Sequence, residues 1–191
     1  MAMNGQRRKG DERKLPGPIE KPPHAEAEGA RLTVRCIAIL SRECNLRASG
    51  ETGAVQEMVM IAGGCLCGAV RYECEGDPDC SLVCYCRDCQ RASGSGHVPA
   101  MSMPRERVTI SGETRSYAAP GGSGKMTVRH FCPTCGSLLF STPEVIPDLV
   151  NIYAGTLDDP SVFKPTWSFF RHSHAPWDRV PDDLPELPVS T

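Results

Sequence analysis

The sequence CPTCGS at residues 132–137 has a counterpart in GCLCG at residues 64–68. In each stretch two closely spaced cysteines precede a glycine, which permits the tight backbone turn that directs N–H groups at the sulfurs. The two turns lie more than sixty residues apart, so a metal held by both would clamp the start of a domain to its middle. Four thiolates are the closed tetrahedral set of a structural zinc. The predicted ligands of this zinc are Cys65, Cys67, Cys132 and Cys135.

A second group of sulfurs lies in VCYCRDCQ, residues 83–90, and consists of Cys84, Cys86 and Cys89. Three sulfurs without an obvious fourth partner are typical of a catalytic zinc, which keeps one position for water or substrate. Zinc with three thiolates carries a net negative charge and is a weak Lewis acid, but it can bind a further thiol and favour the ionised form. Such a site presents the thiolate as a nucleophile.

Other interpretations of this second group stay open. Cys80 lies four residues before Cys84 and could close an inert site of four thiolates. Cys86 and Cys89 alone have the spacing of a redox pair, but the surrounding sequence lacks a βαβ pattern. His97 follows a glycine- and serine-rich loop expected near the site, and either proton transfer or an ordinary surface position fits it. The groups that could offset the negative charge are Arg87, Arg91 and His97.

Composition limits the classes of function. The chain has 191 residues, enough for one domain with its own core, and its formal charge of −2 gives no basic field for nucleic acid or an anionic membrane. The longest apolar run, residues 34–40, is far shorter than a membrane span. The eleven cysteines are odd in number, and cysteines one or two residues apart rarely form an unstrained disulfide. We therefore expect a cytoplasmic protein whose cysteines bind metal.

The organisation of the chain changes near residue 60. Residues 1–59 are charged and rich in proline and glycine at their start, and we expect a disordered extension. Residues 60–188 show short alternating segments between glycine and proline turns, which predict a mainly β domain. One short helix is expected at residues 87–92. The predicted strands are residues 69–74, 107–110, 114–117, 126–131, 137–141 and 149–154.

Several stretches resemble the family of glutathione-dependent formaldehyde-activating enzymes, the GFA/CENP-V domain. They are GCLCGAVRY (64–72), CYCRDCQRASGS (84–95), FCPTCGS (131–137), AGTLDD (154–159) and APW (175–177). The resemblance covers residues from about 61 to 188 and implies a tent-like fold of short antiparallel β-strands with two Zn²⁺ ions. By motif position the structural ligands would be Cys65, Cys67, Cys132 and Cys135. The ligands of the catalytic zinc would be Cys84, Cys86 and Cys89.

The activity implied by the resemblance is the joining of glutathione and formaldehyde to S-hydroxymethylglutathione, classed in the reverse sense as a carbon–sulfur lyase. This agrees with the chemistry expected of three sulfurs, because the thiol would ionise at the zinc and attack the aldehyde carbon. The expected partners are thus a small-molecule thiol and a small aldehyde. The alternative is a non-catalytic zinc module that binds a protein or nucleic acid. The sequence gives no oligomeric state.

Overall fold

The computed structural model describes residues 59–121 and 124–187. Except for Val59, the extension expected to be disordered lies outside the described residues. The described part contains one α-helix and ten strands, joined by short 3₁₀ turns. The strands and the helix are β1 (Met60–Gly64), β2 (Arg71–Glu75), β3 (Cys80–Cys84), α2 (Arg87–Ser93), β4 (Val98–Pro104), β5 (Val108–Ser111), β6 (Arg115–Pro120), β7 (Met126–Phe131), β8 (Leu138–Pro143), β9 (Leu149–Tyr153) and β10 (Trp167–Phe169).

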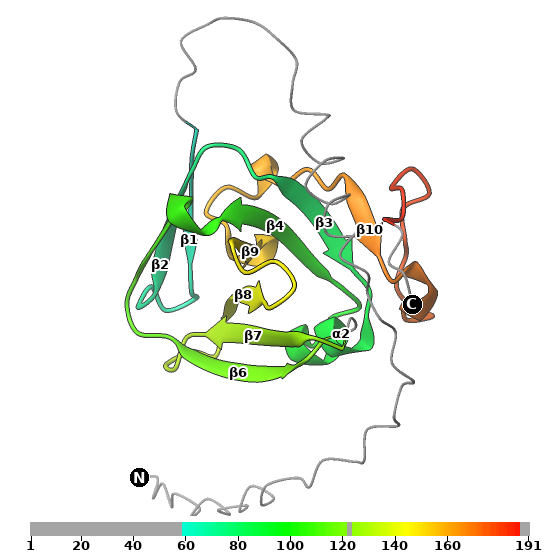
Figure 1. The fold of residues 1–191 in the computed structure, drawn as a ribbon, viewed down its shortest axis with the longest axis horizontal. Coiled ribbons are helices and arrows are strands. Elements are labelled where there is room, and N and C mark those ends of the chain that lie inside the picture. Colours follow the sequence, from blue (N-terminus) through cyan, green and yellow to red (C-terminus); the bar gives the residue numbers. More distant parts are fainter. Residues whose placement is uncertain (1–58, 122–123, 188–191) are drawn as a thin grey trace, which may run out of the picture.

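The strands form two sheets (Figure 1). The smaller sheet has the order β1-β2-β5, and the larger has the order β10-β3-β4-β9-β8-β7-β6. Neighbouring strands are antiparallel, except that β10 runs parallel to β3. In Figure 1 the larger sheet bends so that β3 and β4 form one side and β6 and β7 the base, with α2 at the corner between them. The prediction of a mainly β fold with one short helix is confirmed.

The main hydrophobic core lies between the two sheets. Ile61 and Tyr72 of the smaller sheet pack with Met101, Leu139 and Ile152 of the larger one, and all five side chains are buried. Burying each such side chain contributes about 1.5–3 kcal/mol relative to leaving it in water. The buried hydroxyl of Tyr72 forms a hydrogen bond, because it lies 2.9 Å from Oγ1 of Thr156. The two sheets are therefore one packed unit.

Sequence patterns located some strands and missed others. The prediction for residues 126–131 coincides with β7, and five other predictions overlap β2, β5, β6, β8 and β9. The strands β1, β3, β4 and β10 were not predicted. In β4 (VPAMSMP) prolines stand at two positions and serine interrupts the apolar residues, although the strand lies in the middle of the larger sheet. Burial on both faces removed the alternation that would have identified it.

Replacing Leu139, which is fully buried, with alanine should lower the free energy of unfolding by about 2–5 kcal/mol, because it removes apolar contact and leaves a cavity. Leu66→Ala is the matched control, since Leu66 is 90% exposed, and should change stability by less than about 0.5 kcal/mol. Chemical denaturation of the purified variants measures both values. A loss of similar size in the two variants would contradict the placement of the core.

Candidate metal centres and active site

The first cysteine group joins loops from different sheets. Cys65 and Cys67 follow β1, whereas Cys132 and Cys135 lie between β7 and β8. The four sulfurs lie within 4.8 Å of one another, with 3.5 Å between Cys65 and Cys67 and 3.7 Å between Cys67 and Cys132. A tetrahedral zinc with sulfurs at about 2.3 Å requires sulfur–sulfur distances of about 3.8 Å. The residues therefore fit a zinc ion, as their spacing predicted.

Two glycine turns hold these sulfurs in place. Gly68 and Gly136 have left-handed φ angles of +77° and +73°, and their amides donate to the carbonyls of Cys65 and Cys132 at 3.0 and 2.9 Å. Ser137 connects the two turns: its hydroxyl accepts from the amide of Leu66 at 3.1 Å and lies 3.2 Å from the sulfur of Cys135. The hydrogen bonds from the Ser137 side chain and backbone lower the pKa of Cys135 to about 5. This favours the thiolate that a metal requires.

The second cysteine group is local in sequence. Cys84 ends β3, Cys86 is the N-cap residue of α2, and Cys89 lies in the first turn of that helix. The sulfur of Cys86 accepts a hydrogen bond from the amide of Cys89 at 3.4 Å. The three sulfurs lie within 4.8 Å of one another, and Cys86 is buried while the other two are half-buried. A strand end and a helix start thus fix all three sulfurs.

The thiols of this group differ strongly in pKa. Hydrogen bonds from the thiols of Cys84 and Cys89 lower the pKa of Cys86 to about 3. The same hydrogen bond to Cys86 raises the pKa of Cys84 well above its usual value. Three thiolates this close repel one another, and only a cation among them would allow all three to ionise together. The donor set therefore fits a thiophilic metal such as zinc.

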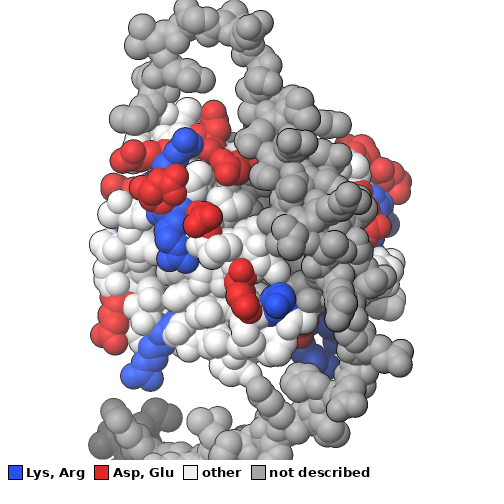
Figure 2. All heavy atoms as spheres, in the orientation of Figure 1, with Lys and Arg blue, Asp and Glu red and all other residues white. Residues whose placement is uncertain are grey.

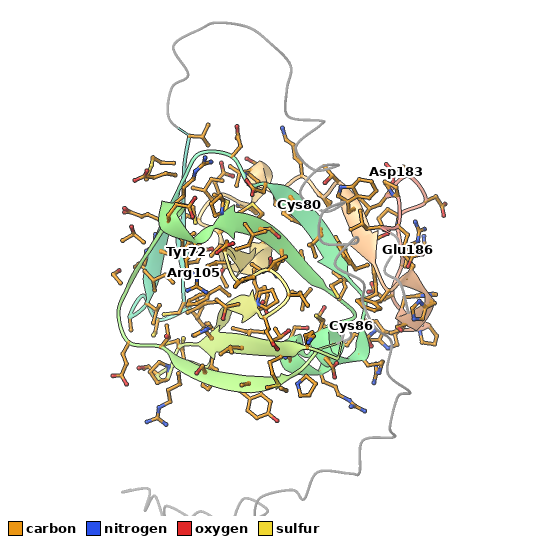
Figure 3. The ribbon with its side chains drawn as sticks, viewed as in Figure 1. Tyr72, Cys80, Cys86, Arg105, Asp183 and Glu186 are labelled. Atoms are coloured by element: carbon orange, nitrogen blue, oxygen red, sulfur yellow. The ribbon has the colours of Figure 1, made fainter. Side chains whose placement is uncertain are left out.

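Cys80 does not belong to this group. It begins β3 and Cys84 ends it, and four residues of extended strand span about 13 Å. Figure 3 shows Cys80 and Cys86 toward opposite ends of this strand. Among residues 59–121 and 124–187, the group has no further Cys, His, Asp or Glu ligand within reach. The alternative in which Cys80 completes four thiolates is wrong.

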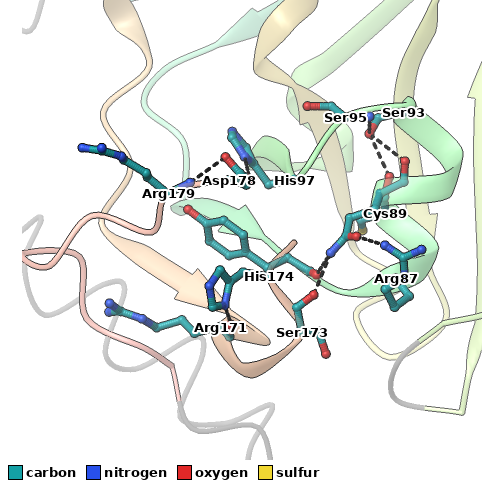
Figure 4. A network of polar contacts seen from close by, with 12 residues as sticks. Arg87, Cys89, Ser93, Ser95, His97, Arg171, Ser173, His174, Asp178 and Arg179 are labelled. Carbon is teal, nitrogen blue, oxygen red and sulfur yellow. Dashed lines mark hydrogen bonds and ion pairs between the residues drawn. The ribbon is translucent and has the colours of Figure 1, made fainter. Parts of the chain in front are cut away.

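The groups close in sequence to the second cluster make other contacts (Figure 4). Arg87 donates to Oε1 of Gln90, and Nε2 of Gln90 donates to the carbonyls of Tyr85 and Ser173 at 2.6 and 2.8 Å. Nδ1 of His97 lies 2.7 Å from Oδ2 of Asp178. These contacts connect α2 and the start of β4 to the C-terminal segment. They do not place Arg87 or His97 at the sulfurs.

His97 lies on the other side of the sheet from Cys84. Val98 pairs directly with Cys84 across β3 and β4, so their side chains share a face. Tyr85 directly follows Cys84 and His97 directly precedes Val98, so extended backbone directs both side chains to the opposite face. There the ring of His97 lies 5.3 Å from the ring of Tyr85. The structure therefore favours a packing position for His97 over proton transfer at the sulfurs.

A buried arginine and a buried tyrosine, neither identified in the sequence, lie beside the second cluster. Arg129 of β7 is 7% exposed and pairs across the strands with Ser141 of β8. Tyr153 of β9 is also 7% exposed and forms a hydrogen bond with Ser141. Arg129 interacts electrostatically with both Cys89 and Tyr153. The one signal that could have been noticed is a charged residue in the middle of the strand that leads into the Cys132 turn.

Tyr153 also forms part of the wall of the site. It packs with Val98 and Ala100, and the half-buried Cys89 and Leu138 contact this cluster. Burial raises the pKa of Tyr153 to about 12, against the effect of its hydrogen bond with Ser141. Its hydroxyl therefore stays protonated at neutral pH and can donate a hydrogen bond.

Comparison with known proteins agrees with this arrangement. The family profile described as glutathione-dependent formaldehyde-activating enzyme matches residues 60–173. The chain belongs to this family. The match includes all seven clustered cysteines, from Cys65 to Cys135, and the family predicted from the sequence is confirmed.

Two individual proteins are similar to this chain. A protein of Halomonas elongata, provisionally named as a glutathione-dependent formaldehyde-activating enzyme, is 31% identical over 105 residues, which are 52% of this chain and 67% of the relative. A crystal structure of a Rhodobacter sphaeroides protein is 22% identical and covers 51% of this chain and 87% of its own, with a TM-score of 0.40. In the described part of this family member, no helix is long and apolar enough to cross a bilayer.

Replacing Gly136 with alanine should destabilise the domain by about 1 kcal/mol, because a left-handed φ is unfavourable for a residue with a Cβ. The effect is one of backbone conformation alone, since an added Cβ would meet nothing within 4 Å. Gly155→Ala is the matched control: its surroundings are equally open, and its φ is not left-handed. Thermal or chemical unfolding measures the difference, and equal stability of the two variants would argue against the strained turn.

Replacing Cys132 with alanine should remove one metal ion per chain and lower stability, because the first group would keep only three sulfurs. Cys74→Ala is the control, since Cys74 is equally buried and outside both groups. Elemental analysis of the purified proteins measures the zinc content. Equal zinc content in the two variants would show that Cys132 is not a ligand.

Proposed function

We propose that this chain is a zinc enzyme that joins a small-molecule thiol, glutathione or a similar compound, to a small aldehyde such as formaldehyde. In the reverse direction the reaction is that of a carbon–sulfur lyase. The observation that carries this proposal is the contrast between the two cysteine groups. One offers four sulfurs, whereas the other offers three and no fourth ligand among the described residues. A site with three protein ligands suits chemistry, and a site with four suits architecture.

The two groups have different roles in this proposal. Cys65, Cys67, Cys132 and Cys135 hold a structural zinc that joins the smaller sheet to the larger one. The ligands of the catalytic zinc are Cys84, Cys86 and Cys89. When bound there, zinc supplies the positive charge that stabilises the thiolate form of a coordinated thiol.

The chain's own residues position and shelter the reactants. The end of β3 and the start of α2 fix the three sulfurs, and the side chains of Val98, Ala100 and Tyr153 form a buried wall against Cys89. This wall limits the access of water to the sulfurs. In the reaction the thiol sulfur forms a bond to the carbonyl carbon, the carbon–oxygen π bond breaks, and the proton lost by the thiol ends on the oxygen.

The proposal includes the bounds of the catalytic domain and its location in the cell. The catalytic domain extends over residues 60–188, and reduced cysteines in this density suit a cytoplasmic location.

The rival function is a zinc module that binds a macromolecule. On the face seen in Figure 2, acidic and basic side chains are interspersed over the described surface, which adds no support for a nucleic acid partner.

Replacing Cys86 with serine tests the proposal. The variant should lose one of two zinc ions, keep its β-sheet circular dichroism, and lose the catalysed formation of S-hydroxymethylglutathione from glutathione and formaldehyde. Cys80→Ser is the matched control, because Cys80 lies in the adjoining strand β3 but outside the group. It should keep both metal ions and its activity. NMR detection of the adduct, after subtraction of the uncatalysed rate, measures the reaction.

Two outcomes would contradict the proposal. If Cys86→Ser unfolds the domain while Cys80→Ser does not, the second group is architectural like the first. If Cys86→Ser loses zinc and keeps full activity, the reaction takes place elsewhere in the chain.

A further inference from the structure

The starting point is the buried charge of Arg129. Its side chain is 7% exposed, and its Nε has no hydrogen-bond partner. The two ion pairs of the described residues, Arg71 with Asp158 and His97 with Asp178, do not include it. A guanidinium stays protonated in proteins, and a buried charge is costly unless an anion compensates it. Arg129 therefore lacks a carboxylate partner within the described part of the chain.

The surroundings of Arg129 place this charge at the second cysteine group. Arg129 interacts electrostatically with Cys89 and Tyr153, and Tyr153 interacts with Cys84 and Cys89 as well. Ser141 pairs across the strands with Arg129 and forms a hydrogen bond with Tyr153. Three neighbouring strands, β7, β8 and β9, thus bring a cation and two hydroxyl groups to one place beside the sulfurs.

The combination of a guanidinium with hydroxyl groups distinguishes a binding site for an anionic oxygen from a simple counter-charge. A cation alone would serve as a counter-charge for the sulfurs and the metal ion. Hydroxyl donors add little to that role, but together with a guanidinium they are well suited to bind an oxygen that carries negative charge. Tyr153 packs against Cys89, so its hydroxyl belongs to the same surroundings as the sulfurs. In the adduct of a thiol with an aldehyde, this oxygen is one carbon away from the sulfur.

We propose that Arg129 and Tyr153 form an oxyanion subsite beside Cys84, Cys86 and Cys89 that binds the oxygen of the aldehyde. The inference rests on the proposed function. As the thiolate sulfur bonds to the carbonyl carbon, the electron pair of the π bond moves to the oxygen. The guanidinium of Arg129 and the hydroxyl of Tyr153 donate hydrogen bonds to that oxygen, and the proton released by the thiol, carried by water, then converts it to the hydroxyl of the product.

A binding experiment tests the subsite without catalysis. The probes are mercaptoacetate, which carries a charged carboxylate whose oxygens lie two carbons from the sulfur, one more than in the adduct, and its neutral methyl ester. Calorimetric titration of the zinc-loaded full chain should show at least about tenfold tighter binding of mercaptoacetate. Chelation of the zinc by the carboxylate would give the same preference, so the Arg129 variant is needed to assign the preference to a separate cation.

Variants connect the preference to the proposed residues. Arg129→Gln should abolish the preference, so that the two probes bind with about equal affinity. The affinity of the variant for the ester should differ from that of the unmodified protein by less than about threefold. Arg115→Gln is the matched control, since Arg115 is an exposed arginine on the adjacent strand β6, and it should keep the preference. Removing an oxyanion donor lowers kcat by about 10²–10³, and we expect this loss for Arg129→Gln in adduct formation from formaldehyde.

Each outcome decides the proposal. Equal binding of the two probes to the unmodified protein would overturn the subsite and leave the proposed function intact. Binding of neither probe would refute the proposed function and the subsite together. Loss of zinc in Arg129→Gln would assign the arginine to the metal site as a counter-charge and overturn the subsite. Should Arg129→Gln fail to fold, Tyr153→Phe replaces it: a preference reduced about threefold supports the subsite, and an unchanged preference overturns it.

Discussion

The contact between two distant cysteine turns is the constraint on which this small β domain depends. One turn follows β1 of the smaller sheet, and the other connects β7 and β8 of the larger sheet. Ser137 joins the turns by hydrogen bonds to both, and the four sulfurs converge to distances that suit a tetrahedral ion. The chain has few aromatic residues, 6% in all, so a cross-link between sheets supplements a modest hydrophobic core.

The second cysteine group differs from the first in how the chain builds it. Its members lie within six consecutive residues, from Cys84 to Cys89, so its formation requires no distant part of the chain. What distant strands contribute is the environment: Val98 and Tyr153 form a wall, and Arg129 brings a positive charge. We expect a locally formed ligand set inside an environment assembled by tertiary structure to lose its metal without loss of the fold. This division separates the part that holds the domain together from the part proposed to react.

Cysteine spacing predicted more of the site than any other feature. Ligand geometry restricts neighbouring cysteines so strongly that both groups could be assigned from CxC and CxxC patterns, and the structure brings the same seven residues together. Arg129 and Tyr153 could not be predicted, because no local pattern distinguishes a buried arginine from one at the surface, and their positions depend on the order β9-β8-β7. Cys80 was ambiguous for a similar reason. Its distance from the group became clear only once β3 was known to be extended.

The parallel strand β10 has a consequence for the strand that carries Cys84. Because β10 pairs with residues 82–84 of β3 and β4 pairs with residues 80–84, the end of β3 has a neighbour on both sides and is not an exposed sheet edge. The edge of β10 is covered in turn, since Ser168 exchanges backbone hydrogen bonds with Pro185 and Leu187 at 2.8 and 2.9 Å. The strand that ends in Cys84 is thereby kept from the edge-to-edge association that leads β-proteins to aggregate.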